Sequence, residues 1–145
     1  FLAIFNTASE NGYGATISSL AAYAIISAAI VHISSNVLVS TAVATTVLAG
    51  ITGSASGGMT IALTTMGDQL IEIANNSGIS MPAMHRIAAV ASGGMDTLPH
   101  NGAVITLLAI TEMKHKQSYV DIGICTVLIP LIATVAIIGC ATLGI

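Results

Sequence analysis

The amino-acid sequence predicts an all-α membrane protein, in which spanning helices accompany a re-entrant helical hairpin and a broken transmembrane helix. Three observations predict this fold class. Of the 145 residues, 54% are hydrophobic and 6% are charged, compared with about a quarter charged in soluble proteins. No Asp, Glu, Lys or Arg occurs between Glu10 and Asp68, or after Asp121. Two glycine-rich stretches of nearly the same sequence, 55–60 and 91–97, interrupt the apolar runs.

Lipid is the solvent that such a chain requires, because long charge-free stretches would expose apolar side chains wherever they lay. A lipid bilayer is therefore the first expected partner. The net charge of -3 comes from few groups, and the three basic residues form no extended patch, so we expect no nucleic-acid binding. The sequence contains no cofactor motif and no cluster of metal ligands, so we expect no cofactor and no bound metal.

The first spanning helix is predicted at residues 15–33. These nineteen residues are apolar or small, and at the rise of an α-helix they extend about 28 Å, close to the thickness of a hydrocarbon core. The preceding stretch, NTASENGYG at 6–14, contains two glycines and several hydrogen-bonding side chains. This composition predicts an interfacial loop that caps the helix.

A helical hairpin is predicted at residues 37–73. Its first arm, 37–51, would reach only about 22 Å as a helix, and the glycine- and serine-rich residues 52–58 cannot comfortably continue it. A second helical run begins at Met59. The pair predicts a re-entrant hairpin whose tip stops inside the membrane, where protein or a water-filled cavity must satisfy the backbone. Two tilted spanning helices joined by a surface loop are the alternative.

A broken transmembrane helix is predicted at residues 82–113. Pro82 suits an early helical position, where its missing N–H costs little. The polar stretch ASGGMDTLPHNG at 91–102 interrupts this helix, and an apolar helical pattern resumes at 103–110. Glycine, proline and charge at membrane depth require a structural or functional reason.

The densest positive charge of the chain follows the broken helix, at Lys114, His115 and Lys116. By the positive-inside tendency, this segment should face the cytoplasm. A last spanning helix, predicted at residues 122–145, would then run outward.

The glycine-rich stretches form a repeat, ASGGMT at 55–60 and ASGGMDT at 91–97, with the two copies 36 residues apart (55 to 91). Paired discontinuous helices bring free N–H groups and positive helix ends to the middle of a membrane, where they can hold an anion. Two alternatives remain. The glycine pairs could simply permit tight helix crossing, and Asp96 or Thr97 could simply cap a helix that begins at Pro99.

Asp96 and His100 are the best candidates for carrying a proton. Burial favours the neutral forms of a carboxyl group and an imidazole, so both groups would exchange a proton near neutral pH. The alternative for His100 is a structural hydrogen bond to a neighbouring backbone carbonyl.

Four segments carry a resemblance to a known family: NTASENGYG, GSASGGMTIAL, MHRIAAVASGGMDTLPHNGAVITLL and KQSYVDI. Together they resemble the C-terminal part of the gluconate permease family of bacterial proton symporters. The segments span most of residues 6–122.

The resemblance implies a multi-pass permease of the bacterial inner membrane, which moves a small hydroxylated carboxylate together with protons. Gluconate, a related sugar acid or a hydroxy acid would be the transported anion. It also implies a fold of two inverted repeats, each with a re-entrant hairpin and a broken helix. Because members of the family are roughly three times longer, residues 1–145 are expected to be a C-terminal fragment that supplies one half. The remainder of the permease chain is then an expected partner, and a homo-oligomer is possible.

The expected site combines the two glycine-rich turns. Asp96, with His100 nearby, would carry the coupling proton, and protonation would lower the cost of moving a negatively charged substrate through a low-dielectric path. Thr97 and Asn101 would contact substrate hydroxyl groups. The backbone and hydroxyl donors expected to bind the substrate carboxylate are Ser56, Gly57, Gly58, Ser92, Gly93 and Gly94.

Two other functions fit the same residues. A membrane-embedded enzyme could use Asp96 and His100 as acid and base, but no nucleophile, metal cluster or cofactor motif accompanies them, so we expect no enzymatic activity. A structural helical subunit would need the glycine-rich turns for assembly alone. Recovery of a chemically unaltered substrate after uptake would separate transport from enzymatic activity. A structural subunit predicts that changes in the two SGG turns harm assembly but not substrate selectivity.

Overall fold

The computed structural model describes residues 2–31 and 33–144, and every regular element within these residues is a helix. The predicted all-α fold class is therefore confirmed. The helices are α1 Leu2–Ser18, α2 Ala21–Val31, α3 Val37–Thr52, α4 Ala55–Asn76, α5 Met81–Ser92, α6 Gly102–Ile110, α7 His115–Gly123, the π-helical turn η1 Ile124–Leu128, and α8 Ile129–Leu143.

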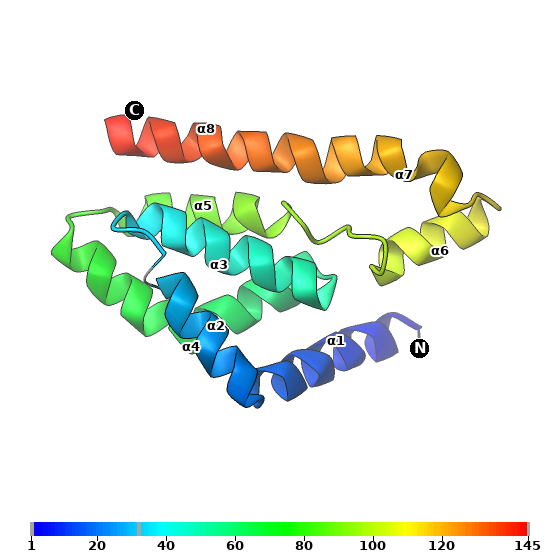
Figure 1. The fold of residues 1–145 in the computed structure, drawn as a ribbon, viewed down its shortest axis with the longest axis horizontal. Helices are drawn as coiled ribbons and strands as arrows, with labels where there is room; N and C mark the ends of the chain where they lie inside the picture. Colours follow the sequence, from blue (N-terminus) through cyan, green and yellow to red (C-terminus); the bar gives the residue numbers. More distant parts are fainter. Residues whose placement is uncertain (1, 32, 145) are drawn as a thin grey trace.

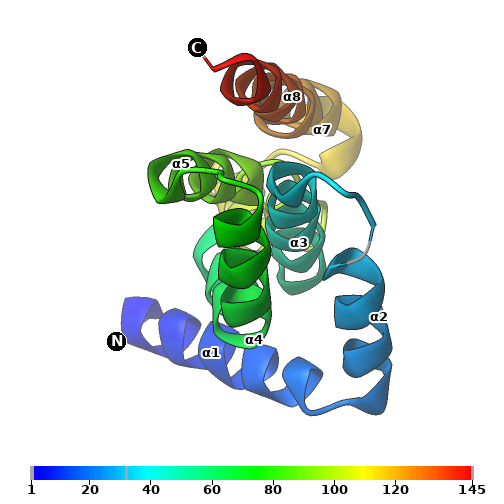
Figure 2. The same ribbon diagram turned by 90° about the vertical axis from the view of Figure 1, so that its left-hand side faces the viewer.

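Helix α3 forms the centre of the molecule. It packs against α4, α5 and α2, and the C-terminal helix α8 lies alongside α5 and α3 (Figures 1 and 2). Its side chains Leu38 and Leu48 are fully buried. The buried hydroxyl groups of Thr41 and Thr45 donate to the carbonyl oxygens of Val37 and Thr41, at 2.8 and 2.9 Å. A buried helix can therefore carry these polar side chains without an unsatisfied donor.

Helices α3 and α4 occupy the stretch predicted as a hairpin, 37–73, and their connection is shorter than expected. Gly53 and Ser54 alone separate the two helices. Gly53 has a left-handed conformation, with a φ of 64°, which glycine adopts without strain. Ser54 caps α4, because its Oγ accepts a hydrogen bond of 3.1 Å from the N–H of Gly57. Residues 56–58, expected in the loop, consequently lie in the first turn of α4.

An irregular segment separates α5 from α6, within the stretch predicted as a broken helix, 82–113. Helix α5 ends at Ser92 and α6 begins at Gly102. We call the intervening residues the 93–101 loop. Two consecutive glycines and a proline disfavour a helix there, and Asp, Thr and Asn side chains compete for its backbone hydrogen bonds.

The last helix begins at His115, earlier than the predicted start at residue 122. It continues through α7, η1 and α8 to Leu143, a length of 29 residues. The N–H of Lys114 donates to Oε1 of Gln117 at 2.9 Å, which stabilises this helix start. Hydrophobicity alone missed the first turns because residues 115–121 are mostly polar.

The N-terminal region differs from the prediction in two places. Residues 6–14, expected as a loop, belong to helix α1. The spanning helix expected at 15–33 is divided between α1 and α2, with a break at Ser19 and Leu20. The hydroxyl groups of Ser18 and Ser19 donate to carbonyl oxygens at the end of α1, at 3.0 and 2.7 Å. Such bonds compete with the helical backbone pattern and favour a break there.

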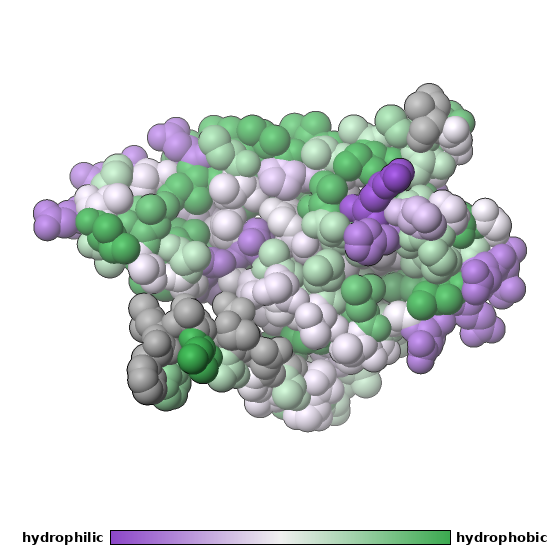
Figure 3. Space-filling view, turned by 180° about the vertical axis from the view of Figure 1, so that it is seen from behind, coloured by the Kyte–Doolittle hydropathy of each residue, from purple (hydrophilic) through white to green (hydrophobic). Residues whose placement is uncertain are grey.

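Apolar side chains cover much of the exterior. On the face drawn in Figure 3, hydrophilic residues gather mainly toward the two ends of the long axis. Among the described helices, the one at 115–143 is long and apolar enough to cross a membrane, by its length and composition. Little of this helix is buried within the chain. Its exposed large side chains are Val120, Ile124, Leu128, Ile129, Ile132, Val135 and Leu143.

The packing of α4 on α3 yields a first prediction, for Gly58→Ala. A Cβ on Gly58 would lie 2.2 Å from the backbone nitrogen of Ala49, so the two helices must move apart. We expect the substitution to destabilise the full-length protein by about 1–3 kcal/mol or more. The thermal stability of the protein purified in detergent, followed by size-exclusion chromatography, measures this loss.

The matched control for Gly58→Ala is Gly67→Ala in the same helix. A Cβ on Gly67 would have nothing within 4 Å, and alanine favours a helix interior over glycine. This variant should be as stable as the wild type, or more stable. Equal stability of the Gly58 and Gly67 variants would contradict the close helix approach at Gly58.

Candidate functional site

The hairpin tip and the 93–101 loop meet at the side chain of Asn101. Its Nδ2 donates to the carbonyl oxygen of Gly53 at 2.6 Å and to that of Asp96 at 2.8 Å. Its Oδ1 accepts a hydrogen bond of 2.9 Å from the N–H of Val104, which caps α6. Both amide hydrogens have partners, and the residue is only 7% exposed. One buried amide therefore joins the hairpin tip, the loop and the first turn of α6. We call this arrangement the Gly53–Asn101 junction.

The Gly53–Asn101 junction places the N-termini of two helices side by side. Ser54 caps α4 and Asn101 caps α6. A Cβ added to Gly53 would lie 3.4 Å from the Cα of Asn101, so the two caps approach closely. Each helix N-terminus carries a partial positive charge of roughly half an elementary unit. Their convergence creates a position that favours an anion.

Small polar side chains lie around this junction. The hydroxyl oxygens of Ser54 and Ser56 are 3.3 Å apart, with Ser54 buried and Ser56 exposed. The imidazole of His100 lies against the hairpin tip, because a Cβ on Gly53 would be 3.2 Å from its Cδ2 and 3.3 Å from its Nε2. Glycine at position 53 thus permits both the left-handed turn and the approach of His100 and Asn101.

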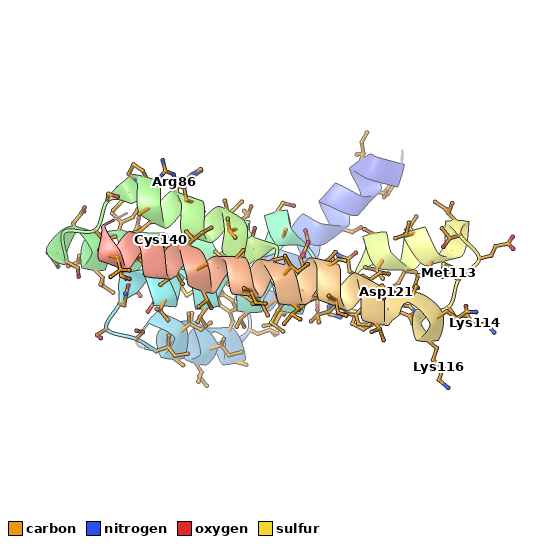
Figure 4. The ribbon with its side chains drawn as sticks, turned by 90° about the horizontal axis from the view of Figure 1, so that it is seen from above. Arg86, Met113, Lys114, Lys116, Asp121 and Cys140 are labelled. Atoms are coloured by element: carbon orange, nitrogen blue, oxygen red, sulfur yellow. The ribbon has the colours of Figure 1, made fainter. Side chains whose placement is uncertain are left out.

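The lysine and arginine side chains of the chain, Arg86, Lys114 and Lys116, lie toward the ends of the long helix 115–143 (Figure 4). The attraction for an anion at the junction therefore comes from helix ends and hydroxyl groups. In the part of the chain that the structure describes, no group of three or more His, Cys, Asp or Glu side chains could hold a metal ion.

The two copies of the SGG motif, 56–58 and 92–94, use their second glycines for packing. A Cβ on Gly58 would clash with the backbone of Ala49 in α3. A Cβ on Gly94 would lie 3.0 Å from Cδ2 of Leu131 in α8 and 3.3 Å from Cγ2 of Thr46 in α3. Both glycines permit a close approach to α3, which was one of the alternative explanations of the repeat.

The N–H groups of the motif glycines have partners within the chain. Ser92 is buried, and its hydroxyl donates to the carbonyl oxygen of Ala89 at 2.9 Å. Ser56 differs from these donors because it is exposed beside the junction. The glycine donors and their acceptors are Gly57 to Oγ of Ser54, Gly58 to the carbonyl of Ser54, Gly93 to that of Val90, and Gly94 to that of Ala91.

Asp96 is half-buried in the 93–101 loop. Its carbonyl oxygen accepts the bond from Asn101, so Asp96 is tied directly to the junction. Helix α6 is capped by Asn101, and the alternative in which Asp96 or Thr97 caps a helix begun at Pro99 is therefore wrong.

The last helix also contacts the 93–101 loop, through residues that the sequence did not reveal. Oη of Tyr119 donates to the carbonyl of Thr97 at 3.2 Å, and the hydroxyl oxygens of Thr97 and Thr126 are 2.5 Å apart. Nε2 of His115 lies 3.0 Å from the carbonyl oxygen of Pro99. Positions 115, 119 and 126 share one helix face. Thr126, a polar residue in the apolar part of this helix, was the available signal.

The fold and the junction define a class of protein: a helical membrane protein in which two polar helix interruptions are joined to each other. Over 138 residues, which are 95% of this chain, the sequence is 51% identical to a protein of Bacillus subtilis (strain 168) described as the uncharacterized transporter YxjC. The chain spans 29% of the length of that relative. No protein-family model and no solved structure matches the chain.

The junction yields a second prediction, for Asn101→Asp. The change keeps the shape and the cap of α6, but it replaces the Nδ2 donor by a carboxylate oxygen that faces the carbonyl oxygens of Gly53 and Asp96. One buried and one half-buried carbonyl oxygen lose their partner, so we expect a loss of about 1–3 kcal/mol of stability. The thermal transition of the full-length protein in detergent measures this loss.

The control for this variant is Asn76→Asp, the same chemical change at an exposed position at the end of α4. We expect its effect to stay within about 0.5 kcal/mol. If Asn101→Asp were as stable as Asn76→Asp, the amide of Asn101 would not be joining the two interruptions.

Proposed function

We propose that this chain forms part of a proton-coupled transporter of the bacterial inner membrane, which takes up a small hydroxylated carboxylate such as gluconate, a related sugar acid or a hydroxy acid. The observation that carries the proposal is the convergence of the α4 and α6 N-termini at the Gly53–Asn101 junction. The similarity to a protein described as a transporter supports the transport role. The specific anion follows from the resemblance to gluconate permeases.

The carboxylate of the substrate would bind in front of the two helix N-termini. No basic side chain is needed there, since the partial charges of two helix ends attract an anion. The exposed hydroxyl of Ser56, in the first turn of α4, would donate to the carboxylate. The backbone of Gly57, Gly58, Gly93 and Gly94 and the hydroxyl of Ser92 would support this site by fixing the two helix breaks.

Hydroxyl groups of the substrate would meet the 93–101 loop. Thr97 offers a side-chain oxygen there, and Asn101 keeps one free lone pair on Oδ1 beside its bond to Val104. Asn101 would mainly hold the site together, because both of its amide hydrogens bind backbone carbonyls. Discrimination among sugar acids would then depend on Thr97.

Asp96 would carry the coupling proton, with His100 at the hairpin tip. A protonated carboxyl group in the loop removes one negative charge near the bound anion, which lowers the cost of moving the substrate through a low-dielectric path. The bond from Asn101 to the carbonyl of Asp96 connects the protonation site to the junction where the anion would sit.

A third prediction concerns Asp96→Asn in the full-length protein reconstituted in liposomes. Uptake by the wild type should increase as the external pH falls, because the protonated form of Asp96 favours the loaded carrier. The variant cannot change its charge, so its uptake should not depend on pH. Initial uptake rates of radiolabelled gluconate, measured between about pH 5 and pH 8, test this expectation.

Asp68→Asn is the control, because Asp68 is an exposed carboxyl group on α4. It should keep the pH dependence of the wild type. A variant at Asp96 that retained the same dependence would remove Asp96 from the proton path and leave His100 as the candidate.

The substrate class is tested by counterflow in liposomes that contain the full-length protein. Liposomes preloaded with an unlabelled acid accumulate a labelled one only if both use the same carrier. A panel of sugar acids, hydroxy acids and unsubstituted carboxylates therefore ranks the substrates. Recovery of the labelled acid unaltered is the result for a transporter, whereas a modified product would favour a membrane-embedded enzyme. No exchange with any carboxylate would refute the proposed function.

A further inference from the structure

The last helix meets the 93–101 loop at a pair of threonine hydroxyl groups. The Oγ1 atoms of Thr97 and Thr126 are 2.5 Å apart. Thr126 belongs to the π-helical turn Ile124–Leu128, the one departure from α-helical geometry within the helix 115–143. A π-turn inserted in a long helix often marks a functional position. The contact joins residues 29 positions apart, so it depends on how the helix packs against the loop.

The donors in this pair can be assigned. Oγ1 of Thr126 donates its hydrogen to the carbonyl oxygen of Ile122 at 2.7 Å, one turn earlier. A hydroxyl group has one hydrogen, so the two contacts are both hydrogen bonds only when Thr97 donates to Thr126. The hydroxyl of Thr97 therefore donates to that of Thr126, which donates to the carbonyl of Ile122. Each bond in such a chain polarises the next in a low-dielectric environment.

This order fixes the chemical character of Thr97. Its hydrogen is used by Thr126, so its oxygen can only accept further hydrogen bonds. The carbonyl of Thr97 is held at the same time by Oη of Tyr119, at 3.2 Å, which limits movement of the loop. A hydroxyl group of a ligand can donate to the oxygen of Thr97, whereas a carboxylate or an ether oxygen cannot.

We propose that Thr126 is a positioning residue for substrate selectivity: it orients the hydroxyl of Thr97 as a hydrogen-bond acceptor for a hydroxyl group of the transported acid. The last helix then contributes to the choice of substrate without touching it. This inference rests on the proposed transport of a hydroxylated carboxylate, and it adds the reason why a hydroxylated acid is preferred over its deoxy analogue.

The test uses Thr126→Val in the full-length protein in liposomes. Valine keeps the shape of threonine and removes the hydroxyl. The apparent KM is measured for pairs of acids that differ by one hydroxyl group, gluconate with 2-deoxygluconate and glycerate with lactate. We expect the preference for the more hydroxylated acid of one pair to fall by roughly two- to tenfold, the range for one neutral hydrogen bond. Thr126→Ser, which keeps the hydroxyl, should restore it.

Two further variants separate a positioning role from a structural one. Thr142→Val removes an exposed hydroxyl from the same helix, one that donates to the carbonyl of Gly139 one turn earlier, and should leave both KM values unchanged. In a Thr97→Val background, Thr126→Val should have no additional effect on selectivity, because it acts through Thr97. The comparison of the double variant with Thr97→Val alone also tests the positioning role if the single variant Thr126→Val is less stable than the wild type.

The outcomes distinguish the two proposals. If wild-type protein exchanges carboxylates but Thr126→Val changes uptake of both members of every pair by the same factor, the contact is structural and this inference is overturned. An additional effect of Thr126→Val in the Thr97→Val background overturns it as well. If the wild type exchanges no carboxylate at all, the proposed function fails and the inference fails with it.

Discussion

The hydrogen bond from Asn101 to the carbonyl of Gly53 is the interaction on which the rest of the structure depends. A helix that ends within an apolar environment leaves carbonyl groups without a partner, and lipid supplies none. The amide of Asn101 supplies one at the hairpin tip, and the same side chain holds the carbonyl of Asp96 and caps α6. Two helix interruptions therefore stabilise each other, whereas either alone would expose unsatisfied backbone groups.

Glycine permits the contact between the two helix interruptions in two ways, through backbone conformation and through close packing. Gly53 adopts the left-handed conformation of the hairpin tip, and the absence of its Cβ lets Asn101 approach. Gly58 and Gly94 bring their segments close to α3. In both motif copies the first glycine is half-buried and the second is buried. Both copies of the repeat therefore use the second glycine for close packing, Gly58 against α3 and Gly94 between α8 and α3.

The sequence predicted the features that depend on local chemistry. Apolar runs predicted helices, and glycine, proline and polar side chains predicted the interruption at residues 93–101, since these residues act on their own backbone. Local chemistry predicted the ends of helices less well. The polar residues 6–14 and 115–121 are helical, and hydroxyl groups at Ser18 and Ser19 divide a run that composition alone would leave continuous.

Contacts between distant segments could not be predicted from the sequence. Asn101 reaches Gly53 across 48 positions, and Thr97 reaches Thr126 across 29. Such pairs depend on the relative placement of whole helices, which no local pattern specifies. Asn101 was therefore expected to contact a substrate. In the structure its amide hydrogens instead donate to the backbone carbonyl oxygens of Gly53 and Asp96.

The absence of a lysine or arginine side chain at the Gly53–Asn101 junction fits the proposed coupling to protons. If the junction lies inside the membrane as proposed, a lysine or arginine there would cost about 2.5–3.5 kcal/mol by insertion scales, and it would hold a carboxylate with a full opposite charge. Helix ends carry only partial charges and are already part of the fold. A site of this kind attracts an anion but does not neutralise it completely. A proton on Asp96 would supply the missing compensation, so binding of the anion and binding of the proton would favour each other, which is the thermodynamic requirement for cotransport.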